Sequence, residues 1–355
     1  MSHIKQSDTH FLDNNMRRCS LIFSFLLILS YSFLFAEDVK DTPKTGEGIQ
    51  AFLKRHNIQG KEYEEEFITL NKATLGKGNS LLKGVSYRLP SLKAAAKQTT
   101  SANKTSTKGA KKKNTLFGSK YEDYVVLSDR LAGACFFLSS GHGGPDPGAI
   151  GKVNGKSLHE DEYAYDVTLR LARRLLEEGA TVHMIIQDAL DGIRDDMYLS
   201  NSNRETCMGA AIPLNQVKRL KQRSDKINSL NRAAKEKYKR EVFIHVDSRS
   251  QKSQLDVFFY YATGSVDGKK LSNTMKETFR AKYQEHQPGR GFAGTVSERN
   301  LYVLNNTIPV GIYAELGNIQ NAFDQQRFLD PNNRQALANW MCLGFMKDYE
   351  NSKKK

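Results

Sequence analysis

Three side chains capable of metal and proton chemistry each stand at the end of an apolar run. His142 follows "ACFFLSSG" and is flanked by glycines, His245 ends "VFIH", and Glu315 ends "GIYAE". Taken singly, a histidine in an apolar run is more often an ordinary core residue. Together, two imidazoles and carboxylates at matched strand ends are typical of a zinc site with three protein ligands and an open position for water.

The elements that must position these side chains follow an alternating pattern. From Tyr121 onward, runs rich in β-branched and aromatic residues alternate with amphipathic stretches, which predicts an α/β domain over residues 121–351. We expect an open, mostly parallel twisted sheet with helices on both faces. Sites in such sheets gather at the carboxyl ends of the strands, where the three side chains would meet. The predicted strands are 134–140, 181–186, 241–246, 255–262 and 309–316, and the predicted helices include 163–179, 214–237 and 269–284.

Four ordered motifs carry a resemblance to a known family. "GHGGPDPGAIG", an acidic helix start, "FIH" and "PVGIYAELGNIQN" occur in that order between about Cys135 and the C-terminus. This order resembles the zinc-dependent N-acetylmuramoyl-L-alanine amidases of the Amidase_3 type. The resemblance implies Zn²⁺ as the cofactor, His142 and His245 as metal ligands, and Glu315 as the catalytic carboxylate. The implied substrate is peptidoglycan, cut at the amide bond between N-acetylmuramic acid and the L-alanine of the stem peptide.

The third metal ligand is where this sequence departs from the family pattern. The family usually opens its first helix with a glutamate, but alignment on "DVTLRLARRL" puts Ala164 at that position. Two glutamates lie upstream, Glu160 and Glu162. Glu160 stands four residues before Ala164, so an added helical turn keeps it on the same face, whereas Glu162 falls on nearly the opposite face. We therefore choose Glu160, and this choice requires that the helix begins early enough to include it.

Three further features of the domain lead to predictions. Residues 188–215 resemble an insertion relative to the family, polar and containing Gly and Pro, between a predicted strand and the next helix. Such a loop is either a lid that partly covers the metal cleft or a surface elaboration far from it. Arg223, ahead of the second histidine, is expected to form a structural ion pair. Asn318 replaces the aromatic residue that usually follows Glu-x-Gly in the family, and we expect activity to survive this change.

The N-terminus and the charge indicate an exported protein. Residues 1–36 contain Arg17 and Arg18, an apolar stretch and Ala36 before acidic residues, which is the layout of a signal peptide. We expect location in the periplasm or cell envelope, with no stable membrane span after signal removal. The formal net charge of +14 favours anionic partners. Export makes nucleic acid an improbable partner and favours the cell wall.

A small module and a linker precede the catalytic domain. Residues 45–90 contain two short helical patterns followed by "LLKGVSYRLP", and this order resembles a LysM domain, a βααβ module that binds N-acetylglucosamine-containing glycans. A small helical spacer is the alternative. Residues 91–120 contain many Lys, Ser, Thr and Ala residues and no acid, so we expect a basic flexible linker there.

These observations predict a peptidoglycan hydrolase that uses zinc-activated water. One alternative is another zinc-dependent cell-wall peptidase, which would release shortened peptides. A second is a catalytically silent wall-binding protein, but the retained Glu315 speaks against it because a pure binder has little need of that carboxylate. The sequence does not tell whether the enzyme requires a protein activator.

Overall fold

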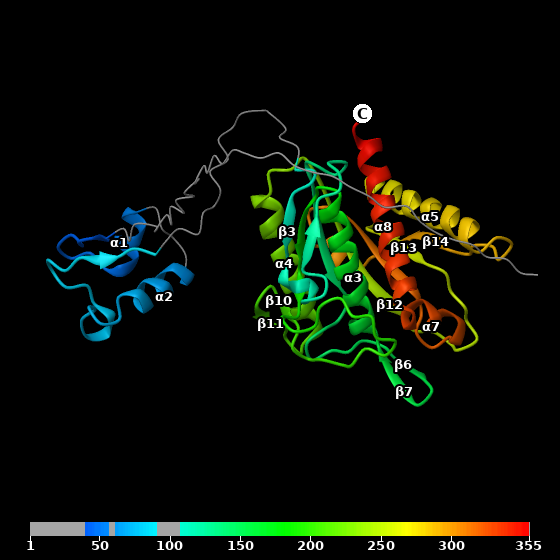
Figure 1. The fold of residues 1–355 in the computed structure, drawn as a ribbon, viewed down its shortest axis with the longest axis horizontal. Coiled ribbons are helices and arrows are strands. Elements are labelled where there is room, and N and C mark those ends of the chain that lie inside the picture. Colours follow the sequence, from blue (N-terminus) through cyan, green and yellow to red (C-terminus); the bar gives the residue numbers. More distant parts are fainter. Residues whose placement is uncertain (1–39, 57–60, 91–106, 355) are drawn as a thin grey trace, which may run out of the picture. The chain divides into compact units, whose positions relative to one another are not determined.

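The computed structural model describes residues 40–56, 61–90 and 107–354 (Figure 1). These residues fall into two compact units, divided near residue 102. The predicted signal peptide at 1–36 and residues 91–106 of the predicted linker lie outside the described residues. Within the described ranges, no helix is both long and apolar enough to cross a membrane.

The N-terminal unit has a βααβ order, and its first strand lies before the module predicted at residues 45–90. Its elements are β1 (Lys40–Asp41), α1 (Ile49–Arg55), α2 (Lys61–Leu70), a short 3-10 helix, η1 (Lys77–Asn79), and β2 (Tyr87–Arg88). The strands β1 and β2 pair antiparallel. Four side chains form the buried core of this unit, namely Phe52, Leu53, Phe67 and Tyr87.

The second unit is built on a six-stranded sheet in the order β14-β13-β15-β12-β5-β8. All neighbouring strands run parallel except the antiparallel pair β13 and β15. The predicted open, mostly parallel sheet is therefore confirmed. The strands are β5 (Ala134–Ser140), β8 (Thr181–Met184), β12 (Tyr238–Asp247), β13 (Phe258–Tyr261), β14 (Thr295–Glu298) and β15 (Val310–Asn318).

Helices cover both faces of this sheet, as the period-two pattern of its strands requires. Along β5, Phe136 and Leu138 join the core cluster that also contains residues of α3, α5 and α8, whereas Cys135 and Phe137 join the cluster under α4 and α6. The helix α8 packs against both α3 and α5 (Figure 1). The helices are α3 (Glu160–Glu177), α4 (Gln216–Ala233), α5 (Val266–His286), α6 (Tyr302–Asn305), α7 (Ala322–Leu329) and α8 (Pro331–Ser352).

The C-terminal part of the predicted linker is ordered, so that prediction was wrong for residues 107–120. Lys111–Lys113 forms β3, which pairs antiparallel with β4 (Asp123–Val125). A second 3-10 helix, η2 (Thr115–Phe117), follows and fully buries Phe117, whose ring meets Tyr124 edge-on at a centroid distance of 6.1 Å. Composition misled here because contacts with distant residues, namely the pairing of β3 with β4 and the burial of Phe117 in the main core, stabilise a lysine-rich stretch.

Candidate metal centre

The candidate site lies where the sheet reverses its strand order. The chain passes from β5 outward to β8 and then returns to β12 on the other side of β5. In open α/β sheets, the crevice at the carboxyl ends of strands beside such a reversal is the usual ligand site. His142 lies two residues beyond β5, and His245 lies near the carboxyl end of β12. The topology therefore brings the two histidines, about one hundred residues apart in sequence, to one edge.

Glu160 joins the two histidines. Its Oε2 lies 3.2 Å from Nε2 of His142, and its Oε1 lies 2.8 Å from Nδ1 of His245. One ligand atom from each of the three side chains falls within 4.8 Å of the others. Two backbone amides also donate to the carboxylate, that of Ala149 at 2.9 Å and that of Val246 at 3.1 Å. Burial alone would raise the pKa of Glu160, but the hydrogen bonds from the histidines hold it well below its usual value.

The two candidate glutamates point to different surroundings. Helix α3 begins at Glu160 itself, three residues earlier than the helix expected from the sequence. Glu162 lies away from the histidines, where its Oε2 accepts from Arg194 Nη2 at 2.7 Å and its Oε1 accepts from the Ser202 amide. Of the two glutamates left by the family comparison, the structure brings Glu160 to His142 and His245.

Two polar side chains, Asp146 and Arg219, fix the orientation of the His142 ring. Its Nδ1 lies 2.9 Å from Oδ2 of Asp146, and Arg219 of α4 donates to that same oxygen. Burial lowers the pKa of His142, but the bonds to Asp146 and Glu160 outweigh it and raise the pKa to about 10. The bond to His142 also lowers the pKa of Asp146 to about 2. The carboxylate thus fixes which ring nitrogen faces Glu160.

The backbone of the loop is held in a conformation that suits the site. His142 has a φ of 54°, which is uncommon for a residue with a side chain and recurs at functional sites. Arg223 of α4 donates to the carbonyl oxygen of His142. Within the described part of the chain Arg223 forms no side-chain ion pair, so the prediction of a structural ion pair was wrong. Its guanidinium instead binds a backbone carbonyl of the His142 loop.

Glycines allow this loop to lie directly against the candidate ligands. A Cβ atom at Gly141 would overlap the ring of His245. A Cβ atom at Gly148 would lie 2.7 Å from both Glu160 Oε2 and His142 Cδ2, and the φ of Gly148 is +67°. The glycine-rich composition around His142 is therefore explained by close approach at these two positions.

Glu315 stands beside His245 on the neighbouring strand. The two residues are register partners in the parallel pair β12 and β15, so their side chains project from the same face of the sheet. The Oε2 atom of Glu315 is buried and has no hydrogen-bond partner among the described residues. Burial, together with the charges of Glu160 and Asp247, raises the pKa of Glu315 well above its usual value. This carboxyl group is thus available to exchange a proton near the histidines.

The sequence reasoning missed two contributors. Tyr313 stacks on the His245 ring with centroids 4.2 Å apart, and it lies two residues before Glu315, so the strand period could have placed it on the same face. Arg219 lies four residues before Arg223 on α4, so helical spacing could have linked the two arginines. No sequence signal, however, connects Arg219 to Asp146, because 73 residues separate them.

The insertion at 188–215 packs against α3 and the His142 loop. Glu205 accepts a hydrogen bond from the Gly144 amide at 2.8 Å. The backbone amide of Arg194 donates to Asp166 of α3 at 2.8 Å. Ile193 and Leu199 are buried. The segment is therefore an integral part of the domain, and its role as a lid stays a prediction.

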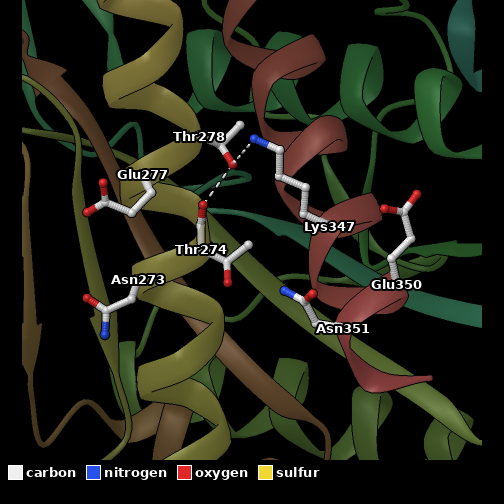
Figure 2. Close-up of a pocket in the computed structure, with 7 residues that line it drawn as sticks. All are labelled: Asn273, Thr274, Glu277, Thr278, Lys347, Glu350 and Asn351. Atoms are coloured by element: carbon white, nitrogen blue, oxygen red, sulfur yellow. Dashed lines mark hydrogen bonds between the residues drawn. The ribbon is translucent and has the colours of Figure 1, made fainter. Parts of the chain in front are cut away.

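A separate polar hollow of about 420 Å³ lies between α5 and α8 (Figure 2). Its single cation, Lys347, donates to Thr278 Oγ1 at 3.3 Å. In the same part of α8, Asp348 and Tyr349 bond to Tyr238 at the start of β12 and to Ala132 before β5. The hollow therefore lies toward the amino ends of the strands, away from the edge that carries the histidines.

The fold and this group of side chains together define a class, namely α/β proteins with a candidate metal site at the switch point of an open sheet. The chain belongs to the Amidase_3 family, N-acetylmuramoyl-L-alanine amidase, whose family model matches residues 137–347. The four motifs in the sequence all lie in or beside this range.

Individual relatives are more distant. The germination-specific N-acetylmuramoyl-L-alanine amidase of Bacillus subtilis (strain 168) is 26% identical over 222 residues, which covers 61% of this chain and 80% of that protein. Similar solved structures include an N-acetylmuramoyl-L-alanine amidase from Clostridium difficile 630, with a TM-score of 0.45, 21% identity and coverage of 62% of this chain and 98% of that one. Another is the CwlD amidase from Clostridioides difficile in complex with the GerS lipoprotein, with a TM-score of 0.46, 20% identity and coverage of 61% and 98%.

Proposed function

We propose that this protein is an exported, zinc-dependent N-acetylmuramoyl-L-alanine amidase of the cell envelope. It would hydrolyse the amide bond between the lactyl group of N-acetylmuramic acid and the L-alanine of the stem peptide. Family membership supports the substrate. The observation that carries the chemistry is the contact of Glu160 with both His142 and His245, beside the unpaired carboxyl group of Glu315.

The side chains at the site fit a zinc ion. Nε2 of His142, Nδ1 of His245 and a Glu160 oxygen are the atoms that converge. Two imidazoles and one carboxylate form a donor set of catalytic zinc sites, which keep a further position open. When bound, Zn²⁺ would supply Lewis-acid polarisation of the scissile carbonyl and a lowered pKa for water.

Glu315 is proposed as the residue that moves the proton. Its carboxylate would accept a proton from the attacking water and deliver it to the departing nitrogen of L-alanine. Its raised pKa makes this carboxylate a stronger proton acceptor than an ordinary glutamate. His245 on the adjacent strand keeps Glu315 in register with the candidate ligands.

The residues behind His142 are proposed to orient it. Asp146 fixes the ring through Nδ1 and leaves Nε2 facing Glu160. Arg219 in turn fixes Asp146. Such partners of a ligating histidine set its tautomer and ring orientation.

The N-terminal unit is proposed to bind the glycan strand. Its βααβ order and the antiparallel pairing of β1 and β2 support the resemblance to a LysM domain. Residues 1–36 would direct export, and the N-terminal unit would then hold the exported enzyme at the wall.

The proposal is tested by mass spectrometry of the products that residues 37–355 release from purified peptidoglycan. We expect intact stem peptides that begin with L-alanine. Their release should stop on treatment with a chelator and resume on addition of zinc. The Glu315→Gln variant serves as the matched control, since it keeps the candidate ligands.

Other product patterns would contradict the proposal. Peptides cut internally would assign the protein to the wall peptidases. Binding to peptidoglycan without any product, in the zinc-loaded protein, would make it a wall-binding protein.

A further inference from the structure

Three buried carboxylates meet beside the His142 loop. Asp161 and Glu162 lie in the first turn of α3, and Glu205 comes from the insertion. All three are almost fully buried, with exposures of 2%, 0% and 5%. One oxygen from each lies within 4.8 Å of the others.

The hydrogen bonds of this cluster leave one oxygen without a partner. Glu162 uses both oxygens, toward Arg194 and toward the amide of Ser202. Glu205 accepts from the Gly144 amide. Asp161 accepts from the Glu162 amide at 2.9 Å through Oδ1, but its Oδ2 is buried and unpaired within the part of the chain that the structure describes. A buried oxygen that lacks a donor is costly and calls for a partner.

The charges of the cluster are also out of balance. In the described ranges, Arg194 is the only side chain that forms an ion pair with any of the three acids. With all three acids ionised, three carboxylates and one guanidinium would leave an excess of negative charge in a place with little solvent. Buried charges of this kind are normally paired or coordinate a metal.

We propose that Asp161, Glu162 and Glu205 bind a hard divalent cation, Ca²⁺ or Mg²⁺, at a site separate from the candidate zinc centre. The donors are carboxylate oxygens, which these cations prefer and which suit zinc less well than imidazole or thiolate. The unpaired Oδ2 of Asp161 is the atom that a cation would satisfy. Glu160 groups with the two histidines, whereas Asp161 and Glu162 group with Glu205, so the two candidate sites are separate.

The site would act as a brace. A cation there would join the N-terminus of α3, which carries Glu160, to Glu205, which holds the His142 loop through Gly144. It would thereby fix the distance between two elements of the candidate zinc centre without touching that centre.

The test is equilibrium dialysis of the full mature chain, loaded with one zinc per chain, against CaCl₂, followed by metal analysis. We expect one bound Ca²⁺ per chain, with a dissociation constant on the order of 0.1–1 mM, as for other extracellular calcium sites. A parallel dialysis with MgCl₂ identifies the preferred cation. Saturable binding of either at one per chain supports the site.

Variants locate the binding. Asp161→Asn and Glu205→Gln should each weaken binding at least tenfold while zinc stays at one per chain. Asp225→Asn, which changes an exposed acid on α4, should bind like the wild type. Thermal melting identifies any variant that fails to fold, and both cluster variants remove a buried like charge, so we expect them to fold.

No binding by the wild-type chain at about 10 mM of either cation, an excess over the expected dissociation constants, would overturn the proposal, and so would unchanged binding in both cluster variants. A proton shared among the three acids would then explain the cluster. None of these readouts depends on hydrolysis, so failure of the cation site and failure of the proposed amidase activity can be told apart.

Discussion

His245 and Glu315 are register partners on neighbouring parallel strands, β12 and β15. Partners of this kind lie about 4.8 Å apart across the sheet and point to the same face. The sheet itself therefore sets the separation between a candidate metal ligand and the proposed proton carrier. Tyr313, stacked on the His245 ring, further limits how that ring can turn.

Replacement of Glu315 tests the proton transfer. We predict that Glu315→Gln lowers kcat for stem-peptide release by about 10²–10⁴-fold, the usual contribution of a positioned acid or base. Zinc content should stay at one per chain, because Glu315 is not among the three convergent ligands. Equal activity of the variant and the wild type would show that another group carries the proton.

Replacement of Asp146 tests the support of His142. Asp146→Asn removes the charge that faces His142 Nδ1 and Arg219. We predict a loss of about 10–100-fold in zinc affinity, the range found for partners of metal-bound histidines. The matched control is Asp225→Asn. Competition with a fluorescent chelator measures the zinc affinity of each variant. Equal zinc affinities in Asp146→Asn and Asp225→Asn would contradict a role for Asp146.

The close approach of the loop can be tested by a single methyl group. Gly141→Ala places a Cβ atom within the space of the His245 ring. We predict that the ring is displaced and that zinc affinity falls at least tenfold, as found when the surroundings of a metal ligand are changed. Gly48→Ala is the control, because no atom lies within 4 Å of its added Cβ. Unchanged zinc binding in Gly141→Ala would mean that the ring does not lie over Gly141.

Glu241 gives a pH-dependent prediction away from the site. It is buried in β12, its Oε1 accepts from Thr307, and its Oε2 has no hydrogen-bond partner among the residues that the structure describes. Burial raises the pKa of this carboxyl group well above its usual value of 4.5. The folded state therefore binds the proton more tightly than the unfolded state, and this group costs stability as pH rises above about 4.5.

Glu241→Gln should remove this pH-dependent cost. As the pH rises from 4.5 to 8, the free energy of unfolding of the variant should increase relative to that of the wild type, so the variant becomes the more stable of the two. The gain is roughly 1.4 kcal/mol for each unit by which folding raises the pKa. Urea denaturation of both proteins at several pH values measures the difference. A difference independent of pH would contradict the assignment.

The N-terminal unit is predicted to contribute to wall binding and not to catalysis. A chain that begins at residue 103 keeps the whole second unit. It should sediment with insoluble peptidoglycan less than the full mature chain does, yet cleave soluble wall fragments at the same rate. Equal sedimentation of the two chains would show that residues 45–90 are a spacer.

Local patterns predicted much of this molecule because periodicity reports which face a side chain occupies. The strands that carry His245 and Glu315 follow from apolar runs, and helical spacing alone favours Glu160 over Glu162. The ordered segment at 107–120 did not follow, since it is held by the pairing of β3 with β4 and by the burial of Phe117, which composition does not reveal.

Long-range contacts were beyond sequence reasoning. The pairing of Arg219 with Asp146 and that of Glu205 with Gly144 depend on how elements 61 or more residues apart pack together. The candidate site is the exception, because its strand ends predicted that His142, His245 and Glu315 meet at one edge of the sheet. Helical spacing added Glu160, and that argument depended on where α3 begins.

The most direct test of the metal centre is anomalous X-ray scattering at the zinc absorption edge from crystals of the zinc-loaded protein. The account predicts one strong peak within bonding distance of His142 Nε2, His245 Nδ1 and a carboxylate oxygen of Glu160, with Glu315 nearby but not bonded. A peak bonded to Glu162 in place of Glu160, or no peak between the two histidines, would contradict it.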